Sequence, residues 1–265
     1  MSLFNFPLRL YGCRAIIIAM ALHELKIRYA GTLAGSLWSV VNPLITILVY
    51  WFVFSVGLKV RPMGEVPFIL FFSIGLIPWT TFSEALTVNS NAIVGNKHLV
   101  KKMVFPTEIL PLVNIAASLI IHLIMMALIA FIILLYGFPL SLLSLQFIYY
   151  LIALSVFTAG LSWFFAAVTV FQRDIGLILG VVLNVWFWLT PVVYGVEVLP
   201  PEYLFFVKLN PMFYIIEGYR NSFIYGVPFW HNLRQAAYFW SLSLSVLVLG
   251  AFFFRRFKND FAEVL

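Results

Sequence analysis

Residues 109–136 read ILPLVNIAASLIIHLIMMALIAFIILLY, without one Asp, Glu, Lys or Arg. A helix needs about 20 apolar residues to cross a hydrocarbon core of roughly 30 Å, because each residue adds about 1.5 Å. This run is longer than that, so we expect its helix to tilt or to project from the bilayer. The run therefore predicts one membrane-spanning helix, and other apolar runs flank it on both sides.

We expect six membrane-spanning segments in a single transmembrane domain over residues 1–265. They cover residues 38–58, 68–86, 109–136, 147–171, 175–193 and 236–254. Backbone groups in lipid must be satisfied within the segment or in a closed barrel. Ten-residue runs of alternating polarity, which are typical of barrels, are absent. The sequence therefore predicts an all-α integral membrane protein with both termini on the same side.

The composition excludes whole classes of protein. Apolar residues make up 63% and charged residues 10%, against roughly 25% charged residues in soluble domains. This excludes a free cytosolic enzyme, a secreted disulfide scaffold and a disordered tail. The lone cysteine, Cys13, excludes an intramolecular disulfide and a cysteine zinc site.

The distribution of Lys and Arg predicts the orientation. Eleven of the 16 lie on the side of the termini and five on the other side, so the positive-inside rule places both termini in the cytoplasm. A cleaved signal peptide is the alternative, because Arg9 and Arg14 precede the apolar run 15–22 and Ala19-Met20-Ala21 resembles a cleavage site. Cleavage would invert the remaining segments and leave nine positive charges outside, so we favour the uncleaved chain.

Three segments lie outside the predicted spans. Residues 8–30 mix basic and apolar side chains, which favours a helix in the membrane interface, although the residues from Glu24 also alternate with period two. The basic loop 95–106 either anchors the chain to anionic lipid or docks a cytoplasmic partner. The outer segment 196–231 is rich in Pro and aromatic residues, and we expect short helices over 201–208 and 212–225. Its aromatic residues form either an interfacial belt or an exit surface for a sugar.

Motifs for catalysis are missing from the sequence. Asp174 and Asp260 lie far apart, and the four histidines lack metal-ligand spacing. Neither Gly-x-Ser-x-Gly nor the phosphate-binding pattern Gly-x-x-x-x-Gly-Lys-Ser/Thr occurs. We therefore expect no catalytic residue and no metal site.

Two ionisable groups fall within or beside the predicted spans. A carboxylate at mid-bilayer costs about 2.5–3.5 kcal/mol on insertion scales, so Glu84 at the end of the second span is a functional candidate. We expect His122 in the third span to make a hydrogen bond between helices. A proton-driven carrier needs a chain of such groups, and two isolated residues do not supply it.

Two spans carry polar and aromatic stripes. Asn42, Thr46 and Tyr50 share one helix face, and the fifth span carries a second stripe. That stripe consists of Asn184, Trp188 and Pro191. The stripes either line a pathway or make interhelical hydrogen bonds worth about 1 kcal/mol or less.

Glycine pairs spaced four residues apart favour the pathway. The pairs Gly31/Gly35 and Gly176/Gly180 adjoin the same two spans, and such pairs allow close helix approach. We therefore expect the first and fifth spans to meet at a subunit interface around a conduit.

Several motifs, in order along nearly the whole chain, resemble those of the ABC-2-type polysaccharide export permeases. Residues 25–38 read LKIRYAGTLAGSLW and are followed by Asn42-Pro43-Leu44. Further matching motifs are Gly75-Leu76-Ile77-Pro78-Trp79, Val100-Lys101-Lys102 with Phe105-Pro106, Arg173-Asp174, Pro191-Val192-Val193-Tyr194, and Asn210-Pro211 with Arg220.

This resemblance implies a function and a set of partners. The chain is expected to be the channel-forming, non-enzymatic subunit of an exporter of lipid-linked polysaccharide, most simply of O-antigen type, in the bacterial cytoplasmic (inner) membrane. Its partners are expected to be a second copy of itself, two ATP-binding subunits, the lipid-linked glycan and membrane lipid, but no nucleic acid. No cofactor is expected on this chain, because ATP and Mg²⁺ bind the partner subunits. The alternative is an ABC-2 exporter of a small hydrophobic drug or lipid, which would have a compact central pocket.

The resemblance and the positions in the chain together assign expected roles. Contact with the ATP-binding subunit falls on Glu24, Lys26, Arg28, Tyr29, Lys97, His98, Lys101 and Lys102. The translocation path falls on Trp38, Asn42, Thr46, Tyr50, Asn184, Trp188, Pro191 and Tyr194. The outer gate falls on Tyr203, Phe206, Tyr214 and Arg220.

Overall fold

The computed structural model describes residues 11–28, 31–32, 35–59, 66–102 and 105–265, apart from the side chains of Ser36 and Lys102. Most of these residues are helical and none of them forms a β-strand, which confirms the all-α prediction. The α-helices are α2 (Arg14–Arg28), α3 (Trp38–Trp51), α4 (Phe68–Ser90), α5 (Ala92–Gly95), α6 (Lys97–Lys102), α7 (Leu110–Leu135), α8 (Phe147–Phe171), α9 (Asp174–Leu189), α10 (Pro201–Leu209), α11 (Pro211–Arg220), α12 (Leu233–Phe257) and α13 (Phe261–Val264). Short 3₁₀ segments are η1 (Gly35–Leu37), η3 (Thr107–Ile109), η4 (Leu142–Gln146), η5 (Val196–Val198) and η7 (Phe229–Asn232), and π-helical segments are η2 (Phe52–Gly57) and η6 (Asn221–Tyr225).

Five helical stretches are long and apolar enough to cross a membrane. They are Trp38–Gly57, Phe68–Ser90, Thr107–Leu135, Leu142–Phe171 and Phe229–Phe257. The helix in the expected fifth span, α9, is apolar but has 16 residues. It ends at Leu189, four residues before the expected boundary, because a residue that precedes proline is pushed out of the helical conformation. Thr190, which precedes Pro191, is accordingly extended, with φ −98° and ψ 133°.

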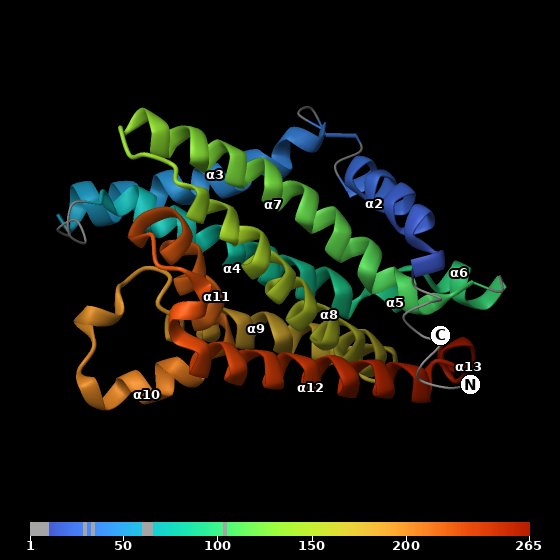
Figure 1. Cartoon of the computed structure of the whole chain (residues 1–265). Coiled ribbons are helices and arrows are strands. Elements are labelled where there is room, and N and C mark those ends of the chain that lie inside the picture. Colours follow the sequence, from blue (N-terminus) through green and yellow to red (C-terminus); the bar gives the residue numbers. More distant parts are fainter. Residues whose placement is uncertain (1–10, 29–30, 33–34, 60–65, 103–104) are drawn as a thin grey trace.

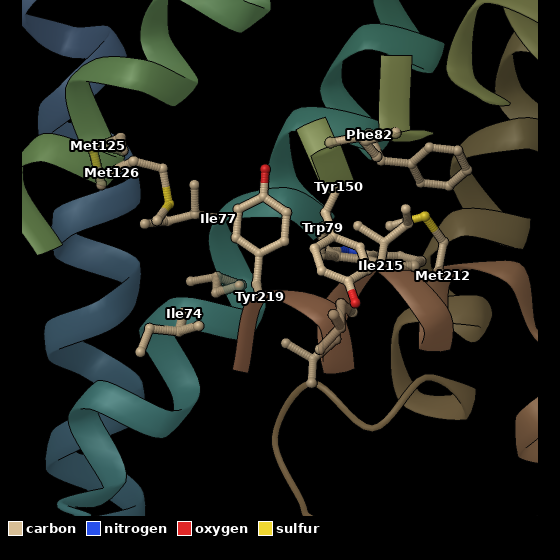
Figure 2. Close-up of a cluster of buried hydrophobic side chains, with 14 of the residues drawn as sticks. Ile74, Ile77, Trp79, Phe82, Met125, Met126, Tyr150, Met212, Ile215 and Tyr219 are labelled. Atoms are coloured by element: carbon tan, nitrogen blue, oxygen red, sulfur yellow. The ribbon is translucent and has the colours of Figure 1, made fainter. Parts of the chain in front are cut away.

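Helix α4 lies at the centre of the bundle. In its most apolar window 72% of the residues are buried, against 6% in the stretch formed by α3 and η2. It packs against α3, α7, α8, α9 and α11. Figure 2 shows Ile74 and Ile77 of α4 near Tyr219 of α11, with Met125 and Met126 of α7 on the far side of Ile77. This chain therefore surrounds α4 and leaves α3 largely uncovered.

The two ends of the bundle differ. Helices α6 and α13 contact each other at one end, called the α6 end here, and α10 lies at the opposite end (Figure 1). At the α6 end, the ammonium of Lys258 lies 3.6 Å from the buried carboxylate of Glu108, and the indole of Trp163 donates to the backbone carbonyl of Glu108 at 3.0 Å. A second apolar cluster there includes Phe254 and Phe261.

Helix α2 lies along α7 (Figure 1). Its buried residue, Ala21, packs against Val113 and Ala117 of α7. Its opposite side exposes apolar residues, including Ile16 and Ile27, in this chain. A helix with one face on protein and one exposed apolar face suits the membrane interface.

Helices α8 and α12 approach until their backbones touch. A Cβ atom at Gly160 would lie 2.6 Å from the backbone nitrogen of Leu247, and one at Gly250 would collide with the carbonyl oxygen of Gly160. Small residues permit such close approach between helices in lipid, where packing rather than the hydrophobic effect drives association.

Replacing Gly250 should separate these two helices. We expect Gly250→Ala to lower the free energy of unfolding by about 1–3 kcal/mol, because its methyl group meets backbone that cannot move aside. Thermal unfolding of the purified protein in detergent measures the change. Gly12→Ala is the control, since no atom lies within 4 Å of the added Cβ; equal melting temperatures for the two variants would contradict the prediction.

Candidate functional site: a polar groove and a buried outer helix pair

A cavity of about 580 Å³ lies between α3, α4 and α9; it is called the groove below. It is lined by Ser39, Asn42, Pro43, Thr46, Tyr50, Leu76, Trp79, Thr80, Ser83, Glu84, Thr87, Val88, Gly180, Leu183, Asn184 and Phe187. Hydroxyl and amide groups predominate among its polar side chains. Such groups in an apolar bundle offer hydrogen bonds to a polar molecule that must leave water.

The groove changes character along its length. Its small polar groups, including Ser83 and Thr87, lie toward the α6 end, because α4 ends there. Its aromatic groups lie toward the α10 end. The ring of Tyr50 stacks on Phe72 at 4.7 Å, and that of Trp79 lies 5.7 Å from Phe187. A molecule that enters the groove from the α6 end therefore meets hydroxyl groups first and aromatic rings next. A molecule that enters from the α10 end meets them in the opposite order.

The structure brings four of the eight expected path residues into the groove. Asn42, Thr46 and Tyr50 line it from α3, and Asn184 lines it from α9. The other four residues lie elsewhere. Trp38 is exposed at the start of α3, Trp188 is 54% exposed, Pro191 is buried after α9, and Tyr194 lines a different cavity.

The predicted stripe on α9 lies only partly in the groove. The residues of α9 that line the groove are Gly180, Leu183, Asn184 and Phe187. At 3.6 residues per turn, Trp188 lies about 90° from the centre of this set. Of the predicted stripe, Asn184 lines the groove, Trp188 points to one side of it, and Pro191 follows the end of the helix.

Helix α4 supplies the part of the groove that the sequence analysis missed. Trp79, Thr80, Ser83, Glu84 and Thr87 recur at spacings of three or four residues and share one face. This period was visible in the sequence, but the apolar residues around it marked α4 only as a span. Glu84, already a functional candidate, belongs to this face.

A second cavity, of about 480 Å³, lies between α9 and α10. It brings together Tyr194, expected in the path, and Tyr203 and Phe206, expected in the outer gate. The junction of α10 and α11 is fixed by Asn210, which accepts a hydrogen bond from the indole of Trp186 at 2.9 Å and donates to Thr190 at 2.8 Å. Asn210 also caps α11, where it accepts from the backbone amide of Met212.

The two other expected gate residues are buried in the bundle instead of forming an outer surface. The hydroxyl of Tyr214 lies 2.8 Å from that of Tyr149. Arg220 is fully buried, and it donates to the backbone carbonyl of Val192 at 2.9 Å and lies 3.6 Å above the ring of Phe71. Glu217 lies 3.7 Å from its guanidinium. Arg220 therefore ties α11 to α4 and to the turn that follows α9.

A hydrogen-bonded chain ties α11 to α4 and α7 as well. The hydroxyl of Thr81 donates to the carbonyl of Ile77 at 2.9 Å, so it accepts from Nδ1 of His122, 2.8 Å away. Nε2 of His122 then accepts from the hydroxyl of Tyr219, also at 2.8 Å. The prediction that His122 bonds helices to one another is confirmed.

Comparison with known proteins assigns this architecture to a family. The family model described as ABC-2 type transporter matches residues 16–224. This chain belongs to the ABC-2 type transporter family. Three relatives, each named O-antigen export system permease protein RfbA, are similar along almost their whole length. Two from Klebsiella pneumoniae are 29% and 28% identical over 251 and 252 residues, which cover 94% of this chain and 95% of each relative. One from Myxococcus xanthus is 31% identical over 260 residues, or 96% of each chain.

As a member of the ABC-2 family, the chain is a multi-pass membrane protein, and the family implies an ATP-binding partner subunit. The residues expected to contact that subunit differ in their exposure in the structure. Lys97, His98 and Lys101 are exposed on α6, Lys26 is exposed on α2, and Glu24 is half-buried. Tyr29 and the side chain of Lys102 lie outside the described residues.

Arg28, also expected at the contact with the partner subunit, reaches the groove within this chain. Its guanidinium forms an ion pair with the carboxylate of Glu84 in the groove. This ion pair links the end of α2 directly to the groove wall. Among the described residues, no cluster of three or more His, Cys, Asp or Glu side chains could hold a metal ion.

The buried guanidinium of Arg220 should hold α11 in place. Arg220→Met keeps the length of the side chain but loses the Val192 hydrogen bond and the ring contact, worth about 2–3 kcal/mol together. With Cys13 replaced by Ser, a cysteine at buried Ser222 should then react with a membrane-impermeant maleimide about tenfold faster. Lys208→Met, an exposed change on α10, is the matched control. Equal labelling rates in the Arg220→Met variant and its parent would contradict the prediction.

Proposed function

We propose that this chain is the channel-forming subunit of an ATP-driven exporter that moves lipid-linked polysaccharide, of O-antigen type, across the bacterial cytoplasmic membrane. The observation that carries the proposal is the groove, which combines hydroxyl, amide and aromatic side chains along the face that α3, α4 and α9 share. Three relatives of nearly equal length are named O-antigen export permeases, which supports this substrate class.

The chemistry of a glycan explains why such a groove is needed. Each sugar hydroxyl that loses water without a new partner costs about 4–8 kcal/mol on the cyclohexane scale. Neutral hydroxyl and amide groups replace those hydrogen bonds, and the rings of Tyr50 and Trp79 offer faces to the C–H side of a sugar. These contacts are individually weak, so a chain of many sugars slides past them without stalling.

Two copies of the chain form the conduit in this proposal. The stretch formed by α3 and η2 is the least covered of the five long membrane helices, and Leu177, Val181 and Trp188 on α9 are exposed beside the groove. A second copy covers these apolar faces and closes two grooves into one path. The alternative cargo, a small hydrophobic drug or lipid, has little use for the eight hydroxyl or amide side chains of the lining.

The motor lies on separate subunits. Two ATP-binding subunits dock on the α6 end, at the exposed basic groups of α6 and the adjacent residues of α2, with both termini of this chain in the cytoplasm. The chain itself binds no cofactor, and ATP with Mg²⁺ binds the partners. Their movement is transmitted to the bundle as rigid displacement of helices.

Removing hydroxyl groups from the groove should impair export specifically. Thr46→Val and Thr80→Val keep the shape of each side chain and remove one hydrogen-bonding group from the lining. At about 1 kcal/mol per hydrogen bond, the double variant should export lipid-linked glycan about tenfold more slowly in vesicles that contain the cognate ATP-binding subunit. Ser245→Ala on the exposed face of α12 is the control. The proposal fails if the unaltered complex hydrolyses ATP and moves no glycan.

The paired arrangement should be detectable by cross-linking. In a Cys13→Ser background, Val49→Cys places a thiol on α3 at a position that is 54% exposed, and Phe131→Cys places one on α7 at 58%. We expect a bifunctional thiol reagent to join two chains through residue 49 in native membranes, because α3 faces the second copy. Cross-linking through residue 131 but not 49 would place the interface on α7 instead.

A further inference from the structure

The charge of the groove depends on one ion pair. Glu84 is the charged member of the lining, whose other polar groups are uncharged hydroxyls and amides. Its carboxylate pairs with the guanidinium of Arg28, the last residue of α2, which approaches from a separate element 56 residues away in sequence. The side chains are 15% exposed for Arg28 and 39% for Glu84.

The pair compensates both charges. Nη2 of Arg28 is buried and has no hydrogen-bond partner among the described residues, so its contact with Glu84 is what balances the guanidinium there. Removing Glu84 leaves the guanidinium of Arg28, which is 15% exposed, without a charged partner, and an uncompensated buried charge is unfavourable. The intact pair has a net charge of zero, and the other polar side chains of the described groove lining are uncharged.

The geometry points to Arg28 and Glu84 as the residues that set the charge selectivity of this exporter, which is built for an electrically neutral glycan. This inference rests on the proposed function and names its substrate more narrowly. A neutral sugar chain finds hydrogen bonds in the groove and loses no charge hydration. A chain with carboxylate sugars must bury each charge without a partner, which is unfavourable.

Removing one partner of the ion pair would change the preference for a neutral glycan, and the sign of the remaining charge sets the direction of the change. With Glu84 unpaired, the groove repels an anionic glycan more strongly. With Arg28 unpaired, the groove attracts an anionic glycan. At an effective dielectric constant of about 20, a charge on the glycan about 12 Å from the surviving charge changes the partition of the glycan into the groove by about tenfold.

The experiment compares two cargoes in vesicles that contain the chain and its ATP-binding subunit. One cargo is a neutral lipid-linked polymer, and the other is the same polymer with one sugar of each repeat replaced by its uronic acid. The ratio of neutral to anionic export should rise about tenfold for Arg28→Gln and fall about tenfold for Glu84→Gln. The double variant Arg28→Gln/Glu84→Gln should return to the ratio of the unaltered protein.

Two further variants separate charge from structure. Thr87→Asp adds a carboxylate to the same lining and keeps the ion pair, so it should change the ratio in the direction of Arg28→Gln even if the pair variants do not fold. Arg14→Gln makes the same chemical change at the exposed start of α2 and should leave the ratio unchanged.

The outcomes distinguish this inference from the function on which it rests. If the unaltered complex exports neither polymer, the proposed function fails and the inference fails with it. If the complex exports glycan and the ratio is the same in Arg28→Gln, Glu84→Gln and Thr87→Asp, the pair is only a structural tie, and the inference alone is overturned.

Discussion

Lipid supplies no hydrogen bonds, and this constraint organises the polar residues of the bundle. Inside the chain, polar side chains bond to groups on neighbouring helices, as Asn89 does with Ser162 and Asn114 at 2.8 and 3.0 Å. Other polar side chains gather along the groove instead. A polar group in such a bundle costs free energy unless it has a partner, so a concentration of partly exposed hydroxyls indicates a path for a polar molecule rather than accidental composition.

Helix α4 connects the two functional regions of the chain. One face supplies the groove with Trp79, Thr80 and Ser83, while its other faces receive α7, α8 and α11. The chain from Thr81 through His122 to Tyr219 fixes α11 against it from within the bundle, and Arg28 reaches it from α2. A displacement of α2 therefore reaches the groove wall through one contact, and a displacement of α4 reaches α11 directly through Phe71 and Arg220 and also through His122.

Most of the architecture could be predicted from hydropathy, because a span needs only length and apolarity. The end of α9 could not, since its last turn is set by the local effect of Pro191. Within the site, the period of Asn42, Thr46 and Tyr50 identified the correct face of α3. Trp188 lies outside the groove lining because a one-residue step from Phe187 rotates a side chain by about 100°. The inward direction of Arg28 depends on a tertiary contact with Glu84, which no local pattern encodes.

The contact beneath α11 restricts the order in which this sequence can change over generations. A Cβ atom on Gly75 would lie 3.1 Å from a guanidinium nitrogen of Arg220 and 3.2 Å from the side chain of Ile216. A larger residue at position 75 requires the side chains of Arg220 and Ile216 to shift by a few tenths of an ångström, and a shorter residue at position 220 would remove the first of these contacts. A change at position 220 before one at position 75 is thus the less crowded order, which couples two positions 145 residues apart in the chain.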